Sequence, residues 1–331
     1  IKSGIIDPDL VADRDTFIWI MIAALLAAAV WLNFATAIGA PVSTTHSIVG
    51  GVLGGGVAAA GWGIADWSVV GQIAASWVIS PVLGGLIAAG FLFLIKRTIT
   101  YKQDVLEAAN RMVPVLVALM AWAFATYLML KGVKKVIAVS FPMALLIGIV
   151  AAFIVYVIMQ PYITRKTAKL NNHKTSVNEL FTVPLICAAA LLSFAHGAND
   201  VANAVGPLAG INEAITQGGV STEAGIPIWV MAVGAIGIAL GLALYGPKLI
   251  RTVGSEITEL DKIRAFCIAM AAAITVIIAS QLGLPVSSTH IAVGGVFGVG
   301  FLREYIKSSY ARMLDVIRDH HADNDPDAVE K

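Results

Sequence analysis

The sequence predicts an all-α membrane protein, a polytopic helix bundle built from two inverted repeats that each carry a re-entrant, broken helix. The first observation is composition: 58% of the 331 residues are hydrophobic, 13% are charged, and the mean hydropathy is +0.83. Soluble proteins average about half apolar and a quarter charged residues. The second is an internal repeat, because residues 35–56 and 279–300 lie 244 positions apart and share 13 of 22 residues. Recurring segments interrupted by glycine and proline are typical of inverted membrane repeats.

Several apolar stretches approach the roughly 20 residues that a membrane-crossing helix needs. They are residues 16–38, 67–95, 112–130, 138–159, 182–195, 226–245 and 263–282. Closely spaced helical runs favour a helix bundle over a β-barrel, whose strands would alternate apolar and polar residues. We therefore expect an integral, multi-pass protein in contact with lipid, in the plasma (inner) membrane.

Net charge, cysteine positions and small residues indicate which binding partners to expect. The net charge of +1 indicates no nucleic-acid partner. Cys187 and Cys267 lie inside apolar runs, which favours core packing over a disulfide or a metal site. Faces of small residues, such as Gly84-Gly85, let helix backbones approach closely and would permit a homodimer.

The chain divides into four predicted segments. Residues 1–159 form the first repeat half, 160–180 a basic cytoplasmic linker, 181–302 the second repeat half, and 303–331 a polar C-terminal tail. The basic segment 96–111 is expected on the same side as the linker, and Glu213 and Glu223 in an outward-facing loop. Because residues 1–4 resemble residues 250–254, the first repeat is expected to be truncated at its N-terminus.

Each long copy predicts a broken helix with polar groups at the break. Gly39 and Pro41 interrupt the first helix, and a serine or threonine next in the chain can cap a new one. The start of the new helix offers unpaired N–H groups and roughly half a positive charge, which favours an anion. The bland alternative is that the hydroxyls only cap a turn, but their duplication favours a ligand site. The candidate donors are Ser43, Thr44, Thr45, Ser287, Ser288 and Thr289.

A histidine follows each serine by three residues, at His46 and His290. The interpretation we favour is a supporting one, in which the ring bonds a neighbouring backbone carbonyl and fixes the turn. A proton relay and a Ser–His catalytic pair are the alternatives.

A second polar cluster lies at residues 193–207, after an apolar run. Asn199, Asp200 and Asn203 offer oxygen ligands for a hard cation, and Gly197 and Gly206 can expose backbone carbonyls by local unwinding. A carboxylate inside a membrane span is costly and indicates a functional site. The alternative is that Asp200 caps a helix at the membrane edge.

These residues resemble the inorganic phosphate transporter (PiT) family of cation-coupled symporters. The sequence Gly-Ala-Asn-Asp-Val-Ala-Asn at 197–203 and the Pro-Val-Ser-x-Thr-His segments at 41–46 and 285–290 carry the resemblance. It implies phosphate between the two serine/threonine turns, and Na⁺ or H⁺ as the coupling ion beside Asn199, Asp200 and Asn203, with no other cofactor. The counterpart of the first motif would lie before residue 1, since 197 − 244 = −47.

The predicted function is thus secondary active import of inorganic phosphate by symport with Na⁺ or H⁺. A sulfate permease of the same fold is the near alternative. A passive anion channel is another, and an intramembrane serine hydrolase using Ser43 or Ser287 is disfavoured because no Gly-x-Ser-x-Gly elbow accompanies either serine. We therefore predict that the protein is not an enzyme.

Overall fold

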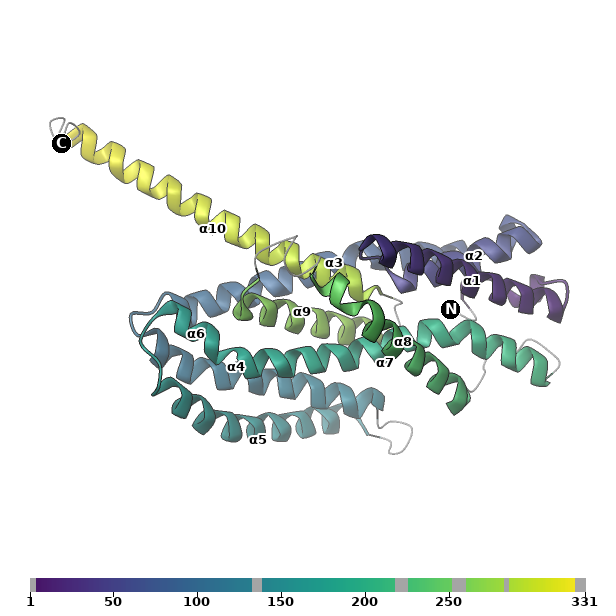
Figure 1. Cartoon of the computed structure of the whole chain (residues 1–331), viewed down its shortest axis with the longest axis horizontal. Coiled ribbons are helices and arrows are strands. Elements are labelled where there is room, and N and C mark those ends of the chain that lie inside the picture. Colours follow the sequence, from purple (N-terminus) through teal and green to yellow (C-terminus); the bar gives the residue numbers. More distant parts are fainter. Residues whose placement is uncertain (1–3, 133–138, 218–225, 252–259, 283–285, 325–331) are drawn as a thin grey trace.

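The computed structural model describes residues 4–132, 139–217, 226–251, 260–282 and 286–324 (Figure 1). Within them the chain is almost wholly helical. Short 3₁₀ turns lie at Pro8–Leu10 and Trp62–Ile64, and π-helical turns at Lys96–Thr100 and Leu128–Gly132. The α-helices are α1 (Arg14–Ile38), α2 (Thr44–Ala60), α3 (Trp67–Ile95), α4 (Val105–Tyr127), α5 (Phe141–Thr167), α6 (Lys174–Leu180), α7 (Thr182–Gln217), α8 (Ile228–Arg251), α9 (Lys262–Gln281) and α10 (Ser288–Asn324).

Among the described residues, seven helices are long and apolar enough to cross a membrane, namely α1, α3, α4, α5, α7, α8 and α9. Each overlaps one of the stretches expected from the sequence, so the prediction of a polytopic helical membrane protein is confirmed. Large apolar side chains on α5 and α8 are exposed, including Phe153 at 67% and Leu244 at 72%. These faces suit contact with lipid.

The two copies of the repeat form helical hairpins, α1 with α2 and α9 with α10. At the end of α1, Gly39 has φ of 80°, and the N–H groups of Gly39 and Ala40 bond to Thr36 and Ala35. This glycine-dependent end confirms the predicted break. The first turns of α2 and α10 lie together, and the two helices run away from each other in opposite directions (Figure 1).

The predicted tail begins inside a helix. α10 runs unbroken for 37 residues from Ser288 across the expected boundary at residue 303. Along its apolar part α10 packs against α3 through small residues. A methyl group at Gly84 or Gly85 would press on backbone oxygens of Ile291 or Gly294, so the packing interpretation of this glycine pair is confirmed.

The expected linker is folded against helix ends. Asn172 Oδ1 accepts the N–H groups of Val105 and Leu106 at the start of α4, and Asn178 Oδ1 accepts that of Ile263 in α9. These caps place residues 96–111 on the same side as the linker, as predicted. Lys262 hydrogen-bonds to the Glu179 carboxylate in α6 and lowers the pKa of that group below its ordinary value.

α7 departs most from its predicted span. The helix continues through the polar cluster to Gln217 without a break. Local unwinding at Gly197 and Gly206 is therefore wrong, since a regular helix already satisfies its own backbone groups inside a membrane. Glu213 lies in the last turns of α7 and is 4% exposed, so its expected place in an outward loop is also wrong; Glu223 lies outside the described residues.

Candidate functional site

A serine caps the helix that follows each break. Ser43 Oγ accepts the backbone N–H of His46 at 3.1 Å in α2, and Ser287 Oγ accepts that of His290 at 3.2 Å in α10. Both serines are at most 5% exposed. The hydroxyls satisfy N–H groups that a first helical turn leaves unpaired. The two copies thus share one cap geometry.

The next residue in each copy donates to one shared carboxylate. Thr44 Oγ1 and Ser288 Oγ lie 3.2 Å from Asp200 Oδ2, and they occupy equivalent repeat positions, since 288 − 44 = 244. The two hairpin tips therefore converge on the same atom.

Asp200 lies at the middle of α7. It follows Thr182 by 18 residues (200 − 182) and precedes Gln217 by 17 (217 − 200). At 1.5 Å per residue, each end of the helix is roughly 26 Å away. With 5% exposure, Asp200 is a buried carboxylate in the middle of a helix that is long and apolar enough to cross a membrane, and its position contradicts the alternative of a cap at the end of this helix.

The third hydroxyl of the first copy ties three segments together. Thr45 is fully buried, its Oγ1 donates to the Val286 carbonyl at 3.0 Å, and it accepts from Asn203 Nδ2 at 2.8 Å. This joins α2 to the second hairpin tip and to α7. Its counterpart Thr289 is half-buried in the first turn of α10.

The sequence interpretation did not single out His196 as a functional residue. His196 Nε2 lies 2.9 Å from Asp200 Oδ2, one helical turn earlier on α7. The available signal was the spacing of four residues between the two side chains, which places them on one face of a helix.

The histidines of the two repeats lie against each other. The ring centroids of His46 and His290 are 4.5 Å apart, and the Trp77 ring of α3 lies 3.5 Å from that of His46. His46 Nδ1 is 2.7 Å from Ser43 Oγ. The partner of His46 Nδ1 is thus the capping hydroxyl rather than a backbone carbonyl.

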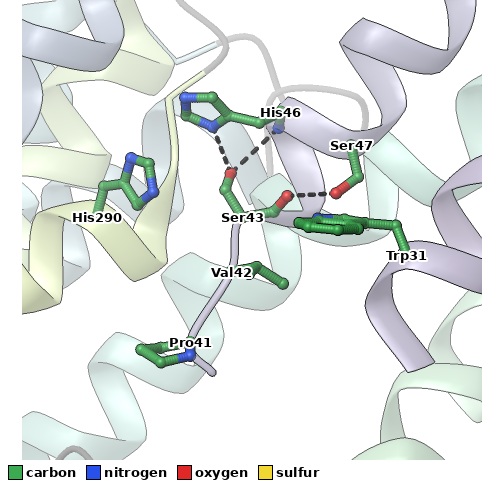
Figure 2. A pocket seen from close by; sticks show the side chains of 7 residues that line it. All are labelled: Trp31, Pro41, Val42, Ser43, His46, Ser47 and His290. Carbon is green, nitrogen blue, oxygen red and sulfur yellow. Dashed lines mark hydrogen bonds between the residues drawn. The ribbon is translucent and has the colours of Figure 1, made fainter. Parts of the chain in front are cut away.

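A cavity of about 290 Å³ opens beside these rings (Figure 2). It is lined by Trp31, Pro41, Val42, Ser43, His46, Ser47 and His290. Its volume is roughly ten times the ~30 Å³ that one water molecule occupies in the liquid. The cavity thus leaves room for a small hydrated ion next to the hairpin tips.

Oxygen atoms dominate the cluster around Asp200. No group of three or more His, Cys, Asp and Glu side chains comes together within the described residues. Hydroxyl, amide and single-carboxylate oxygens are the ligands of hard cations such as Na⁺ rather than of transition metals. Pro285 and the side chain of Asn199 lie outside the described part, so the place of Asn199 in this cluster stays a prediction.

Comparison with known proteins assigns the family. A family model described as "Phosphate transporter family" matches residues 1–319. The chain belongs to the phosphate transporter family.

One bacterial and one archaeal relative carry the name "Putative phosphate permease". The one from Helicobacter pylori strain J99 is 57% identical over 323 residues, 97% of this chain and 61% of that protein. The one from Pyrococcus abyssi is 38% identical, covering 96% of this chain and 78% of that protein. The chain thus spans about three fifths of the length of its Helicobacter relative.

A solved structure of a member titled "The sodium-dependent phosphate transporter" superposes with a TM-score of 0.84 at 35% identity. It covers 91% of this chain and 74% of that one. The likeness confirms the all-helical membrane fold of this family member.

Proposed function

We propose that the protein imports inorganic phosphate by symport with a cation, with alternating access around the site at Asp200. The observation that carries the proposal is the shared carboxylate, which is buried near the middle of α7 and accepts a hydroxyl proton from each repeat. Membership of the phosphate transporter family supports phosphate as the substrate. We also propose that the protein lies in the plasma membrane and that it consists of two inverted repeats. The proposed segments of the chain end at residues 159, 180 and 302.

Phosphate is proposed to bind where the two helix starts meet. Hydroxyls and backbone N–H groups bind an oxyanion without a fixed positive charge, which suits a site that must also release it. Thr44 and Ser288 are the direct donors, while Ser43 and Ser287 hold the turns in shape through their caps. Thr45 and Thr289 are the two remaining hydroxyl residues proposed to contribute to the phosphate site.

The position of the Asp200 carboxylate explains why phosphate binding would be coupled to the binding of a cation. Asp200 Oδ2 accepts the hydroxyl protons that an oxygen of phosphate would accept. An anion brought to the same donors meets a negative charge unless a cation or a proton neutralises it, so the two ligands favour each other's binding. Asn199 and Asn203 are proposed to add oxygen ligands to the cation.

Na⁺ is the proposed coupling ion, supported by the name of the solved relative and by the hydroxyl oxygens around Asp200. A specific observation favours H⁺ as the second candidate. His196 Nε2 is close enough to Asp200 Oδ2, at 2.9 Å, to share a proton with it.

The deciding experiment is uptake of labelled phosphate into proteoliposomes containing the whole protein, with Na⁺ and pH gradients imposed separately. Uptake driven by an inward Na⁺ gradient at equal pH on both sides is expected. Uptake driven only by a pH gradient would replace Na⁺ with H⁺. Uptake that ignores both gradients would indicate a passive channel and overturn the proposal.

Two controls test for a sulfate permease and for a serine hydrolase. Excess unlabelled sulfate that abolishes phosphate uptake would point to a sulfate permease. The contact between Ser43 and His46 resembles the first pair of a serine hydrolase. The His46 ring, however, lies against Trp77 and His290, whereas a catalytic Ser–His pair needs an acidic side chain to orient the histidine. Labelling by a fluorophosphonate that is lost in Ser43→Ala would revive it.

A further inference from the structure

The inward face of α3 carries two buried donors that have no hydrogen-bond partner in the part of the chain that the structure describes. Ser80 is 5% exposed, and neither Ser80 Oγ nor Trp77 Nε1 meets a partner among the described residues. The hydroxyl of a serine or threonine in a helix can donate a hydrogen bond to the backbone carbonyl one turn earlier, as Thr275 does to Ala271. Ser80 does not make this bond, and a buried donor left unpaired lowers the stability of the fold.

The register of α3 places both donors beside the hairpin tips. Trp77, Ser80 and Gly84 occupy positions i, i+3 and i+7, which share one face of a helix. At one end of this row, Trp77 stacks on His46 of α2. At the other, Gly84 lies against the backbone of Ile291 in α10. Ser80 therefore lies between a contact to the first turn of α2 and a contact to the first turn of α10.

We propose that Trp77 and Ser80 are further ligands of the transported anion, supplied by a third helix. The inference rests on the proposed function of the same site. A tetrahedral oxyanion has four oxygens and accepts more hydrogen bonds than Thr44 and Ser288 can donate. The indole N–H and the serine O–H are neutral donors, like the hydroxyls of the two tips. Each gains its missing partner when the anion binds.

Trp77 and Ser80 are assigned as anion ligands because of their position beside the hairpin tips, and not only because they lack a hydrogen-bond partner. Trp122 Nε1 on α4 is also buried without a partner among the described residues. That ring lies against Gly148 of α5, in the α4–α5 pair and not at the hairpin tips. Trp122 is therefore the matched control for Trp77.

The test measures phosphate uptake by the whole protein carrying Trp77→Phe or Ser80→Ala. Phenylalanine keeps an aromatic ring against His46 and removes only the N–H. Trp122→Phe and Thr275→Val remove equivalent groups elsewhere. We expect KM for phosphate to rise roughly tenfold in each of the first two variants, with little change in Vmax, since one hydrogen bond to a charged ligand is lost. The two controls should keep KM within about twofold of wild type.

Equilibrium binding of labelled phosphate to the purified protein keeps this inference separate from the transport proposal. Affinity reduced in Trp77→Phe and Ser80→Ala supports the ligand role even if the wild type shows no coupled uptake. An unchanged affinity and KM in both variants overturns the ligand role while leaving phosphate transport intact. A wild-type protein that neither binds nor takes up phosphate overturns both.

Discussion

Replacing Asp200 by asparagine tests the coupling mechanism at its centre. The substitution keeps the shape of the side chain and removes the charge that three donors, Thr44, Ser288 and His196, now contact. Two unit charges 4 Å apart interact by about 4 kcal/mol at the effective dielectric of a partly solvated protein site. Loss of that attraction corresponds to a cation affinity roughly a thousandfold weaker.

The assay is the initial rate of labelled phosphate uptake into proteoliposomes as the Na⁺ concentration is varied. We expect Asp200→Asn to lose cation-driven uptake while it still inserts into membranes and elutes as a folded protein from size-exclusion chromatography. Glu107→Gln removes an exposed carboxylate that pairs with Arg111 on α4 and serves as the control. Normal uptake with an unchanged cation dependence in Asp200→Asn would refute the role of this carboxylate.

Three other sets of contacts can be tested by substitution. Thr44→Val and Ser288→Ala should each weaken phosphate affinity by about 1.5–3 kcal/mol, roughly 10- to 150-fold in KM; a large effect in one with none in the other would contradict the shared site. Gly294→Ala should destabilise the protein by about 1–3 kcal/mol in thermal unfolding, because its methyl group would meet the α3 backbone. Gly300→Ala, which has open space, is its control, and equal melting temperatures would contradict the close packing. Asn172→Ala should cost about 1 kcal/mol of stability through the lost cap of α4, and an unchanged melting temperature would show that the cap is dispensable.

The sequence was sufficient to predict features that depend on repetition and on local chain chemistry. The duplicated segment identified Ser43 and Ser287 as equivalent positions, and glycine and proline near residue 40 predicted the end of α1 where it occurs. Long apolar runs predicted the spans, because a membrane helix must satisfy its backbone internally and cover itself with apolar side chains.

Contacts between distant segments were not predictable in the same way. The repeat shows that six hydroxyls lie near two helix starts, but only packing decides that Thr44 and Ser288 reach Asp200 while the serines before them act as caps. The continuity of α7 was also missed. Its glycines allow unwinding but do not require it when neighbouring helices supply partners to the polar side chains.

The shared carboxylate relates the symmetry of the repeats to alternating access. Thr44 and Ser288 belong to different hairpins, and Asp200 belongs to neither, since it lies on α7. In the proposed mechanism, moving one hairpin away from α7 breaks one hydroxyl bond to Asp200 and leaves the other in place. The hydroxyl bond lost from Asp200 costs about the same on either side, on the order of 1.5–3 kcal/mol for a hydrogen bond to a charged group. Moving the first hairpin also separates Thr45 from Asn203 of α7, so the two openings differ by that neutral bond and not by the bonds to the carboxylate. Comparable costs at the carboxylate help a transporter to populate both of its access states, because a site held by one hairpin alone would strongly favour the closed side.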